Sequence, residues 1–329
     1  MTEIDRTQPI AELSAAIITY NEAERIGECL ASLAPICAEI IVLDSNSTDR
    51  TREICSEYPN VRFEQRAFEG YARQKNLALQ SVRTPWAVCL DADERLTPAA
   101  ADEIRKFFTQ PVAPEIIGAK LIRRTYHLGA FIEHGGWTHY RYRLVRKDEV
   151  EWRDTAGMPL HELLYPIGAT GWNRKNGVTL GGDIIHSSKT DLSNQVDTIN
   201  VYSSIFAGSR QRQRTARASR RSHRKPLYLF RMLLKPPLKF IEIYFAKLGF
   251  LDGYRGLIIA ASSSFATFLR WAKLYELANT EVREASNLPD FLKQRFPDAD
   301  ARRESPNVSR DAGVTARNQN LTTPEGRSS

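Results

Sequence analysis

Two aspartates one residue apart, Asp91 and Asp93, form the pair with the clearest chemical potential in this chain. They directly follow residues 86–90, an apolar run that predicts a short buried strand. Alternate positions at a strand end bring both carboxylates to the same mouth of a sheet, where oxygen ligands can hold a hard divalent cation. A chain of this length contains about one Asp-x-Asp by chance, so the pair is informative only together with its neighbours.

The elements that must position this pair alternate between strands and helices. Strands are expected at about 15–19, 39–43, 61–63 and 86–90, with helices at about 26–33, 49–58 and 71–81 and a fourth from 98 onward. We expect Ser47 or Thr48 to cap the second helix and Pro98 to open the fourth. This order predicts a parallel sheet covered by helices on both faces, whose ligands bind beyond the carboxyl ends of the strands.

Polar residues gather at three of these strand ends. Tyr20, Asn21 and Glu22 follow the first strand, Asp44 ends the second, and the aspartate pair ends the fourth. Their shared position predicts one ligand site at the edge of the sheet. The sequence has neither the glycine fingerprint of dinucleotide-binding folds nor a P-loop, which argues against both of those classes. Residues 116–185 change to a pattern of strands and loops, which we expect to complete the cleft.

Four segments together resemble the family 2 glycosyltransferases with the GT-A fold. They read IITYNE at 17–22, VLDSNSTD at 42–49, QKN at 74–76 and LDADE at 90–94. Residues 240–253 extend the similarity to the branch that includes lipopolysaccharide inner-core β-glucosyltransferases, so the resemblance runs from about residue 13 to residue 274. Asn46 replaces the usual glycine, yet asparagine tolerates a left-handed backbone. Thr138 and His139 stand where an acidic residue is expected, which leaves the acceptor open.

The resemblance implies an α/β fold with a Rossmann-like nucleotide-binding sheet and an acceptor-side half, followed by C-terminal membrane-associated helices. It also implies an inverting, metal-dependent transfer from a nucleotide-sugar, a UDP-sugar first, to a lipid-linked saccharide such as lipopolysaccharide core. Mg²⁺ or Mn²⁺ would stabilise the departing diphosphate. Asp93 would bind the metal, and Asp91 would lie at the ribose side or join the metal. His186 would complete the metal shell or be a buried structural histidine.

The resemblance also implies a set of residues around the nucleotide: Thr19, Tyr20, Asn21, Glu22, Asp44, Lys75, Asn76 and Asp91. Tyr20 and Asn21 would contact the base, and Asp44 would accept a hydrogen bond from its imide. Helix capping is the alternative role for Asn21 and Asp44. A solvated surface position is the alternative for Lys75.

An inverting transfer needs a carboxylate that takes the proton of the acceptor hydroxyl. Glu162 is our first choice and Asp154 the second, while a surface salt bridge is the alternative role for Glu162. His161 and Trp137 are expected at the acceptor. Trp137 follows two glycines and offers a flat face for a sugar ring, unless it belongs to a core.

We expect five segments: an N-terminal extension (1–12), the GT-A domain (13–190), an Arg-rich helical linker (191–224), amphipathic membrane-associated helices (225–278) and a polar, largely disordered tail (279–329). The N-terminus lacks the apolar core of a signal peptide. No cysteine pair has metal-site spacing, so reduced core residues are expected at the four positions Cys29, Cys37, Cys55 and Cys89.

The C-terminal part is both basic and apolar. The chain has a net charge of +7, and residues 205–255 carry roughly eleven net positive charges. Residues 227–235 and 240–250 mix large apolar side chains with Lys and Arg, and we expect Pro236 and Pro237 to separate them. This profile indicates helices lying on an anionic membrane surface, at the cytoplasmic face of the inner membrane. The uncharged run at 256–269 is shorter than the roughly twenty residues needed to cross.

Two rival functions remain at this point. A non-catalytic membrane-recruitment or nucleic-acid-binding protein on a degenerate GT-A scaffold would explain the basic segment, but the intact aspartate pair argues against it. The Arg-rich run also lacks aromatic residues for base stacking, so no nucleic acid partner is expected. A nucleotidyltransferase should carry a glycine-rich basic loop after the first strand, where this chain has Tyr20 to Ala23.

Overall fold

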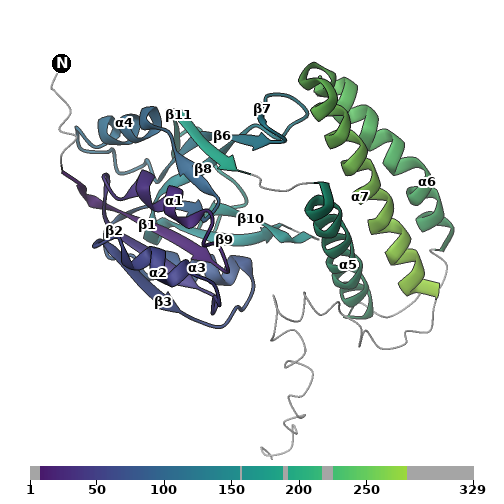
Figure 1. Cartoon of the computed structure of the whole chain (residues 1–329), viewed down its shortest axis with the longest axis horizontal. Helices are drawn as coiled ribbons and strands as arrows, with labels where there is room; N and C mark the ends of the chain where they lie inside the picture. Colours follow the sequence, from purple (N-terminus) through teal and green to yellow (C-terminus); the bar gives the residue numbers. More distant parts are fainter. Residues whose placement is uncertain (1–7, 156–157, 188–191, 217–224, 280–329) are drawn as a thin grey trace, which may run out of the picture.

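The computed structural model describes residues 8–155, 158–187, 192–216 and 225–279. A mixed α/β body and a layer of three long helices lie side by side (Figure 1). The tail expected from residue 279 and most of the N-terminal extension lie outside the described residues.

Four parallel strands form one half of a nine-stranded sheet, in the order β3-β2-β1-β4. Their bounds are β1 (Ile10–Thr19), β2 (Cys37–Asp44), β3 (Val61–Gln65) and β4 (Trp86–Asp91). Successive residues of β1 point to opposite faces, so Ala15 and Ile17 enter one core cluster while Ala16 enters the other. Both faces of β1 are therefore buried, as its continuous apolar sequence predicts.

Helices cover both faces of this half-sheet. They are α1 (Ile26–Leu33), α2 (Thr51–Ser56), α3 (Tyr71–Ser81) and α4 (Pro98–Phe107). Leu30 of α1 and Ile104 of α4 pack in the same cluster as Ile17, whereas Leu79 of α3 packs on the other face. Thr97 caps α4 by accepting a hydrogen bond from the Ala100 amide at 3.2 Å, and Pro98 takes the first position, as predicted.

Strands β1 to β4 are parallel, as predicted, whereas the second half of the sheet, mainly from the region predicted as strands and loops, runs in mixed directions. It contains β5 (Glu94–Leu96), β6 (Gly118–His127), β7 (Ala130–Ile132), β8 (His139–Arg146) and β11 (Gly177–Ser187). The chain turns back at β7, so β8 returns antiparallel to β6 and inserts beside β4. After the short helix η1 (Lys147–Glu149), β9 (Val150–Thr155) and β10 (Met158–Pro166) form a separate antiparallel pair.

The helical layer consists of α5 (Leu192–Ala216), α6 (Lys225–Ile241), the π-helical turn η2 (Glu242–Ala246), η3 (Gly249–Asp252) and α7 (Gly253–Asn279). Pro236 and Pro237 lie inside α6, so the predicted break at these prolines is wrong. Helix α6 packs along α7, and beside the prolines the Ser264 hydroxyl donates to the Pro236 carbonyl at 2.8 Å. Within the described ranges, every helix is too short or too polar to cross a membrane.

Specific contacts tie the helical layer to the sheet at the β6–β7 turn. The Gly135 amide donates to the Lys247 carbonyl and Arg255 Nε to the Leu128 carbonyl, both at 2.9 Å. Ile132 packs against Ile243 in a shared apolar cluster. The layer is thus anchored at one end to the second half of the sheet.

Candidate active site

A cavity of about 790 Å³ opens at the carboxyl ends of β1 and β4. Its walls come from these strand ends, from β8, from the β9–β10 pair and from Tyr202 of α5. The volume lies in the range of small-molecule sites. The site is therefore at the edge of the sheet where the sequence predicts it.

Asp91 joins residues from three elements at the centre of this cavity. Its Oδ1 lies 2.5 Å from Lys75 Nζ of α3, and its Oδ2 lies 3.0 Å from Arg143 Nη2 of β8. Burial alone would raise the pKa of Asp91, but the two cations outweigh it and hold the pKa well below its usual range. Asp91 is thus ionised, and each of its carboxylate oxygens is ion-paired with a cation.

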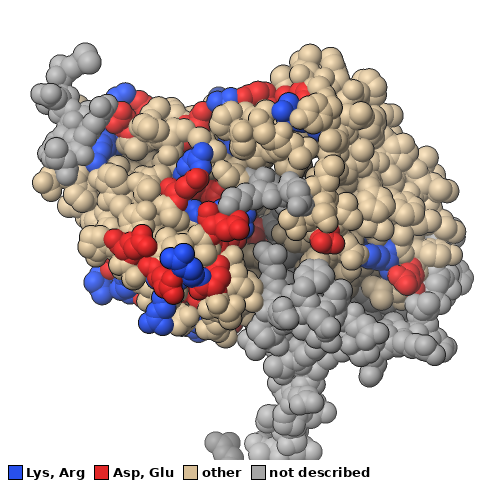
Figure 2. Space-filling view, viewed as in Figure 1, with Lys and Arg blue, Asp and Glu red and all other residues tan. Residues whose placement is uncertain are grey.

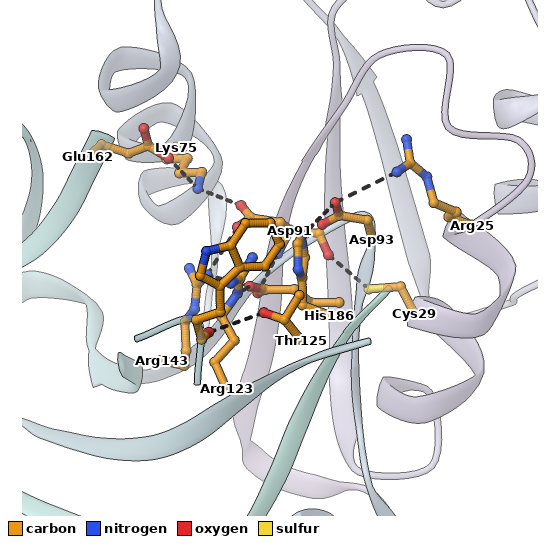
Figure 3. Close-up of polar contacts among 12 residues, drawn as sticks. Arg25, Cys29, Lys75, Asp91, Asp93, Arg123, Thr125, Arg143, Glu162 and His186 are labelled. Carbon is orange, nitrogen blue, oxygen red and sulfur yellow. Dashed lines mark hydrogen bonds and ion pairs between the residues drawn. The ribbon is translucent and has the colours of Figure 1, made fainter. Parts of the chain in front are cut away.

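Lys75 is buried, which excludes the solvated position considered for it. Its Nζ lies 2.6 Å from Glu162 Oε1 of β10 and 4.5 Å from the ring centroid of Trp152. Burial lowers the pKa of Lys75, but Asp91 and Glu162 together raise it above its usual value. Figure 3 shows Lys75 reaching Asp91 from one side, while Arg25 reaches Asp93 from the other.

Glu94 is a buried carboxylate that sequence reasoning missed. Its Oε1 contacts Arg143 Nη2 at 2.8 Å and Arg123 Nε at 2.5 Å, and its Oε2 accepts from the Asp91 amide at 3.1 Å. Lys75, Arg123 and Arg143 therefore face three carboxylates, those of Asp91, Glu94 and Glu162. Arg141 and Arg143, at alternate positions of β8, were the sequence signal for positive charge at this wall, and Arg143 is the one that joins the network.

Asp93 and His186 form a second polar pair at the cavity wall. His186 Nε2 lies 3.1 Å from Asp93 Oδ2, and Arg25 Nη1 lies 3.7 Å from the same oxygen. Burial raises the pKa of Asp93, but the hydrogen bond and charge of His186 lower it overall. The buried His186 Nδ1 has no hydrogen-bond partner in the part of the chain that the structure describes.

The side chains of Asp93 and His186 can supply part of the coordination shell of a divalent cation, and a bound substrate would complete that shell. In the described ranges, no three His, Cys, Asp or Glu residues group together as an all-protein metal cage. Mg²⁺, however, is usually held by one or two carboxylates together with substrate phosphates. Asp93 supplies one such carboxylate, with the His186 imidazole beside it, whereas both oxygens of Asp91 face cations.

Asn21 and Asp44 hold two loops together beside the cavity. Asn21 (φ 52°) accepts from the Thr48 amide and donates its own amide to Ser47 Oγ, both at 2.8 Å. The buried Asp44 accepts from the Ser47 amide at 2.7 Å and from Gln65 Nε2 at 3.2 Å. Asn46 adopts φ 63°, the left-handed conformation expected for it.

The capping roles predicted around these loops are wrong. The N-cap of α1 is Arg25 and that of α2 is Arg50, neither with a side-chain cap. Ser47 and Thr48 bond instead to Asp44 and Asn21, because the two loops satisfy each other's polar groups before either helix begins.

The acceptor-side predictions divide between the cavity and its surroundings. Glu162 lines the cavity, while Asp154, its cross-strand partner on β9, is exposed and lies outside the lining. Burial and the charge of Glu162 raise the pKa of Asp154. Trp137 packs with Ile132 in the apolar cluster that anchors the helical layer. His161 lies on β10, and its side chain is outside the described part.

A stacked aromatic pair lines the cavity where Trp137 was expected. The rings of Tyr142 and Trp172 lie 3.6 Å apart with an interplanar angle of 8°, and Trp172 Nε1 donates to the Leu164 carbonyl at 2.7 Å. Gly118 makes room for the pair, since a Cβ there would lie 2.4 Å from the Trp172 ring. Gly177, paired with Gly118 in register, does the same for Tyr142.

Comparison with known proteins identifies the family. Residues 14–155 match the model of glycosyl transferase family 2. The chain is also 30% identical over 289 residues to the lipopolysaccharide core biosynthesis glycosyltransferase LpsC of Rhizobium meliloti (strain 1021), covering 86% of this chain and 98% of that protein. The chain belongs to glycosyltransferase family 2. It is therefore a glycosyltransferase, and its α/β fold is GT-A-like, as the resemblance predicts.

Other relatives of this family 2 glycosyltransferase extend along most of its length. An uncharacterized glycosyltransferase of Rickettsia bellii (strain RML369-C) is 26% identical over 302 residues, covering 87% of this chain and 92% of the relative. Among solved structures, S. aureus TarS 1–349 in complex with UDP-GlcNAc has a TM-score of 0.39 and 14% identity, over 81% of this chain and 90% of that one.

In this glycosyltransferase, the predicted site residues fall into two groups. Those that line the cavity are Thr19, Tyr20, Glu22, Lys75, Asp91, Asp93, Glu162 and His186. Those outside its lining are Asn21, Asp44, Asn76, Trp137 and Asp154. Asn76 instead bonds both the amide and the carbonyl of Trp152, each at 2.8 Å, and so fixes β9 on α3.

Proposed function

We propose that this glycosyltransferase is an inverting, metal-dependent enzyme that moves a sugar from a nucleotide-sugar to a lipid-linked saccharide such as lipopolysaccharide core. One observation carries the proposal. A single cavity contains the Asp93–His186 pair at its strand-end side and Glu162, held by Lys75, on the opposite β10 wall. Departure of a diphosphate and deprotonation of an acceptor need these two kinds of group in one place.

The donor nucleotide is proposed to bind at the ends of β1 and β4, and a UDP-sugar is the first candidate. Tyr20, Phe68 and Tyr71 line this side of the cavity, and the Phe68 and Tyr71 rings meet edge to face at 5.0 Å. Aromatic faces suit a nucleobase. Asp91 would lie at the ribose, and Asp44, which bonds Ser47, would shape the loop near the base rather than contact it.

Asp93 and His186 are proposed to hold Mg²⁺ or Mn²⁺ together with the donor diphosphate. Such an ion, when bound, would neutralise the charge of the departing diphosphate. Arg25, 3.7 Å from Asp93, adds positive charge on the same side of the cavity. Asp91 would stay paired with Lys75 and Arg143.

Glu162 is proposed as the general base. As the acceptor oxygen bonds to the anomeric carbon, the bond from that carbon to the diphosphate breaks, and Glu162 takes the hydroxyl proton. Attack opposite to the leaving group inverts the configuration. Lys75 holds Glu162 toward the cavity, and when Glu162 becomes neutral, Lys75 still has Asp91 as a partner. The network therefore tolerates the change of charge.

The helical layer is proposed to hold the enzyme on the cytoplasmic face of the inner membrane, next to a lipid-linked acceptor. Figure 2 shows a mainly uncharged surface over α6 and α7. Large apolar side chains that are exposed in this layer are Leu229, Phe230, Leu233, Leu234, Leu238, Ile241, Phe245, Phe250, Leu251 and Leu257. An apolar surface of this extent is typical of an interaction site. Arg231 and Lys235 of α6 would attract anionic headgroups.

The proposal is tested by donor hydrolysis over a panel of UDP- and GDP-sugars with Mn²⁺. Cation-dependent cleavage of at least one UDP-sugar is expected, and NMR of a transfer product from an α-linked donor should show a β-linkage. An α-linked product would exclude inversion. No cleavage of any donor, combined with binding to vesicles or to DNA, would favour the non-catalytic alternative.

A further inference from the structure

Arg141 of β8 lines the cavity and has no ion-pair partner among the described residues. Its side chain is partly buried in the wall of the cavity. Among the described residues it forms no ion pair, hydrogen bond or aromatic contact, in contrast to its neighbour Arg143. A partly buried charge without a partner is costly, so its presence in a cavity needs an explanation.

The carboxylates that could compensate Arg141 are already occupied. Asp91 is bound by Lys75 and Arg143, Glu94 by Arg123 and Arg143, and Glu162 by Lys75. Arg123 and Arg143 lie together on one side of Asp91 in Figure 3. Three cations therefore balance the three carboxylates of this network, and Arg25 and His186 face the other two cavity carboxylates, those of Glu22 and Asp93, so Arg141 forms no ion pair with any of the five.

The surroundings of Arg141 are positive. Burial lowers the pKa of Arg141, and Arg143 and Arg123 lower it further, while Glu94 compensates only in part. His139, two residues away on β8, also lines the cavity. Burial, Arg141 and Arg123 lower the pKa of His139 to about 4, so this imidazole is neutral at pH 7. The β8 wall is thus ready to accept negative charge.

We propose that Arg141 is the centre of a subsite for an anionic substrate group, a phosphate or a carboxylate. A guanidinium can bind either group through two parallel hydrogen bonds. The inference rests on the proposed transfer reaction, which brings two sources of such a group into the cavity: the donor diphosphate and a charged sugar of the acceptor. Tyr142, the next residue on β8, stacks on Trp172, and this aromatic wall suits a saccharide ring. The acceptor is therefore the favoured source.

The test compares Arg141→Gln and Arg141→Lys with Arg83→Gln. Arg83 is a matched control because its side chain is 74% exposed and lies outside the cavity lining. In the first arm, calorimetry of the full chain with Mn²⁺ measures the affinities for UDP and for uridine. In the second arm, the UDP-saturated enzyme is titrated with glucose 6-phosphate, glucuronate or glucose. Tryptophan fluorescence follows binding, since Trp152 and Trp172 line the cavity.

If the anionic group belongs to the acceptor, Arg141→Gln should weaken binding of glucose 6-phosphate and glucuronate by about tenfold or more. The affinities for glucose and UDP should stay unchanged. Arg141→Lys should lose less affinity for the charged sugars, because lysine keeps the positive charge but lacks the two parallel N–H donors of the guanidinium. Weaker UDP binding with unchanged uridine binding would instead identify the donor diphosphate. The proposed subsite is refuted if the two Arg141 variants have wild-type melting curves and bind every ligand of both arms with the same affinity as Arg83→Gln. If the wild-type enzyme binds no UDP, the proposed donor is refuted. Titration of the wild-type and Arg141→Gln proteins with inorganic phosphate would then test the subsite independently.

Discussion

The two walls of the cleft differ in how they are built. The wall proposed to bind the donor, called the donor wall, lies at the ends of β1, β2 and β4, beside loops that are fixed by hydrogen bonds such as that between Asn21 and Thr48. The wall proposed to bind the acceptor, called the acceptor wall, consists of β8, β9 and β10, and Lys75 connects it to the donor wall by pairing with both Glu162 and Asp91. Lys75 and Asp91 therefore link the two walls, whereas the donor loops are fixed mainly by their own contacts.

The largest effect that tests this comparison is expected from Glu162→Gln. Turnover should fall by about two or more orders of magnitude, because the amide cannot accept the acceptor proton. Folding and donor binding should persist, since Lys75 keeps Asp91 as its partner. Steady-state kinetics and calorimetry check the two parts.

Asp154→Asn is the matched control for Glu162, because Asp154 is the cross-strand partner and is exposed. Its turnover should stay within about threefold of wild type. A larger loss in Asp154→Asn than in Glu162→Gln would transfer the role of base to Asp154.

The next effect is on stability and comes from Asp91, where the two walls meet. Asp91→Ala leaves Lys75 and Arg143 with fewer counter-charges, so the free energy of unfolding should fall by about 2 kcal/mol. Urea unfolding at pH 7 measures this, with Asp154→Ala as the exposed control. Equal stability of the two variants would show that the ion pairs do not couple the walls.

The pH dependence of stability sharpens the same point. The pKa of Asp91 is lower in the folded protein than in the unfolded chain, because Lys75 and Arg143 favour the ionised form. Its stabilisation is therefore complete above the unfolded value of about 3.9 and is lost as the pH falls toward the folded value. Between about pH 5 and pH 3, wild-type stability should decrease more steeply than that of Asp91→Ala. Parallel curves in urea titrations would contradict this prediction.

A smaller effect is expected on donor affinity from Asp93→Ala. Cation-dependent binding of a UDP-sugar should weaken by about tenfold or more, because the proposed metal loses its carboxylate. EDTA should weaken wild-type binding to a similar extent and leave the variant unchanged. Calorimetry with Mn²⁺ checks both, and equal affinity in Asp93→Ala would refute the metal assignment.

The smallest effect concerns the helical layer. Leu233, 67% exposed on α6, should contribute to membrane binding, so Leu233→Ser should lower partition onto anionic vesicles by about fivefold. Leu192→Ser on α5 is the matched control, because Leu192 is also exposed but lies outside the apolar surface of α6 and α7. Flotation should weaken at high salt without being abolished. Weak flotation together with a shift of a DNA probe would refute membrane attachment.

The sequence by itself determined much of the donor wall. Strands β1 to β4 and helices α1, α3 and α4 were predicted near their observed positions, because their apolar periods are local properties of the chain. Tyr20, Asp91 and Asp93 reach the cavity because residues at the carboxyl ends of parallel strands must meet at one edge. Short motifs carry this kind of information, and the family membership confirms the resemblance that they indicated.

Only the tertiary structure decided the acceptor wall. Lys75 meets Glu162, 87 positions later in the sequence, so neither its burial nor its partner could be derived from its helix. The same holds for Glu94 with Arg123 and Arg143, which lie on separate strands. Tyr142 and Trp172 line the cavity in place of Trp137 because two paired glycines leave room for their rings. Charge compensation and packing depend on which distant residues fill the same space, and local periodicity does not encode that.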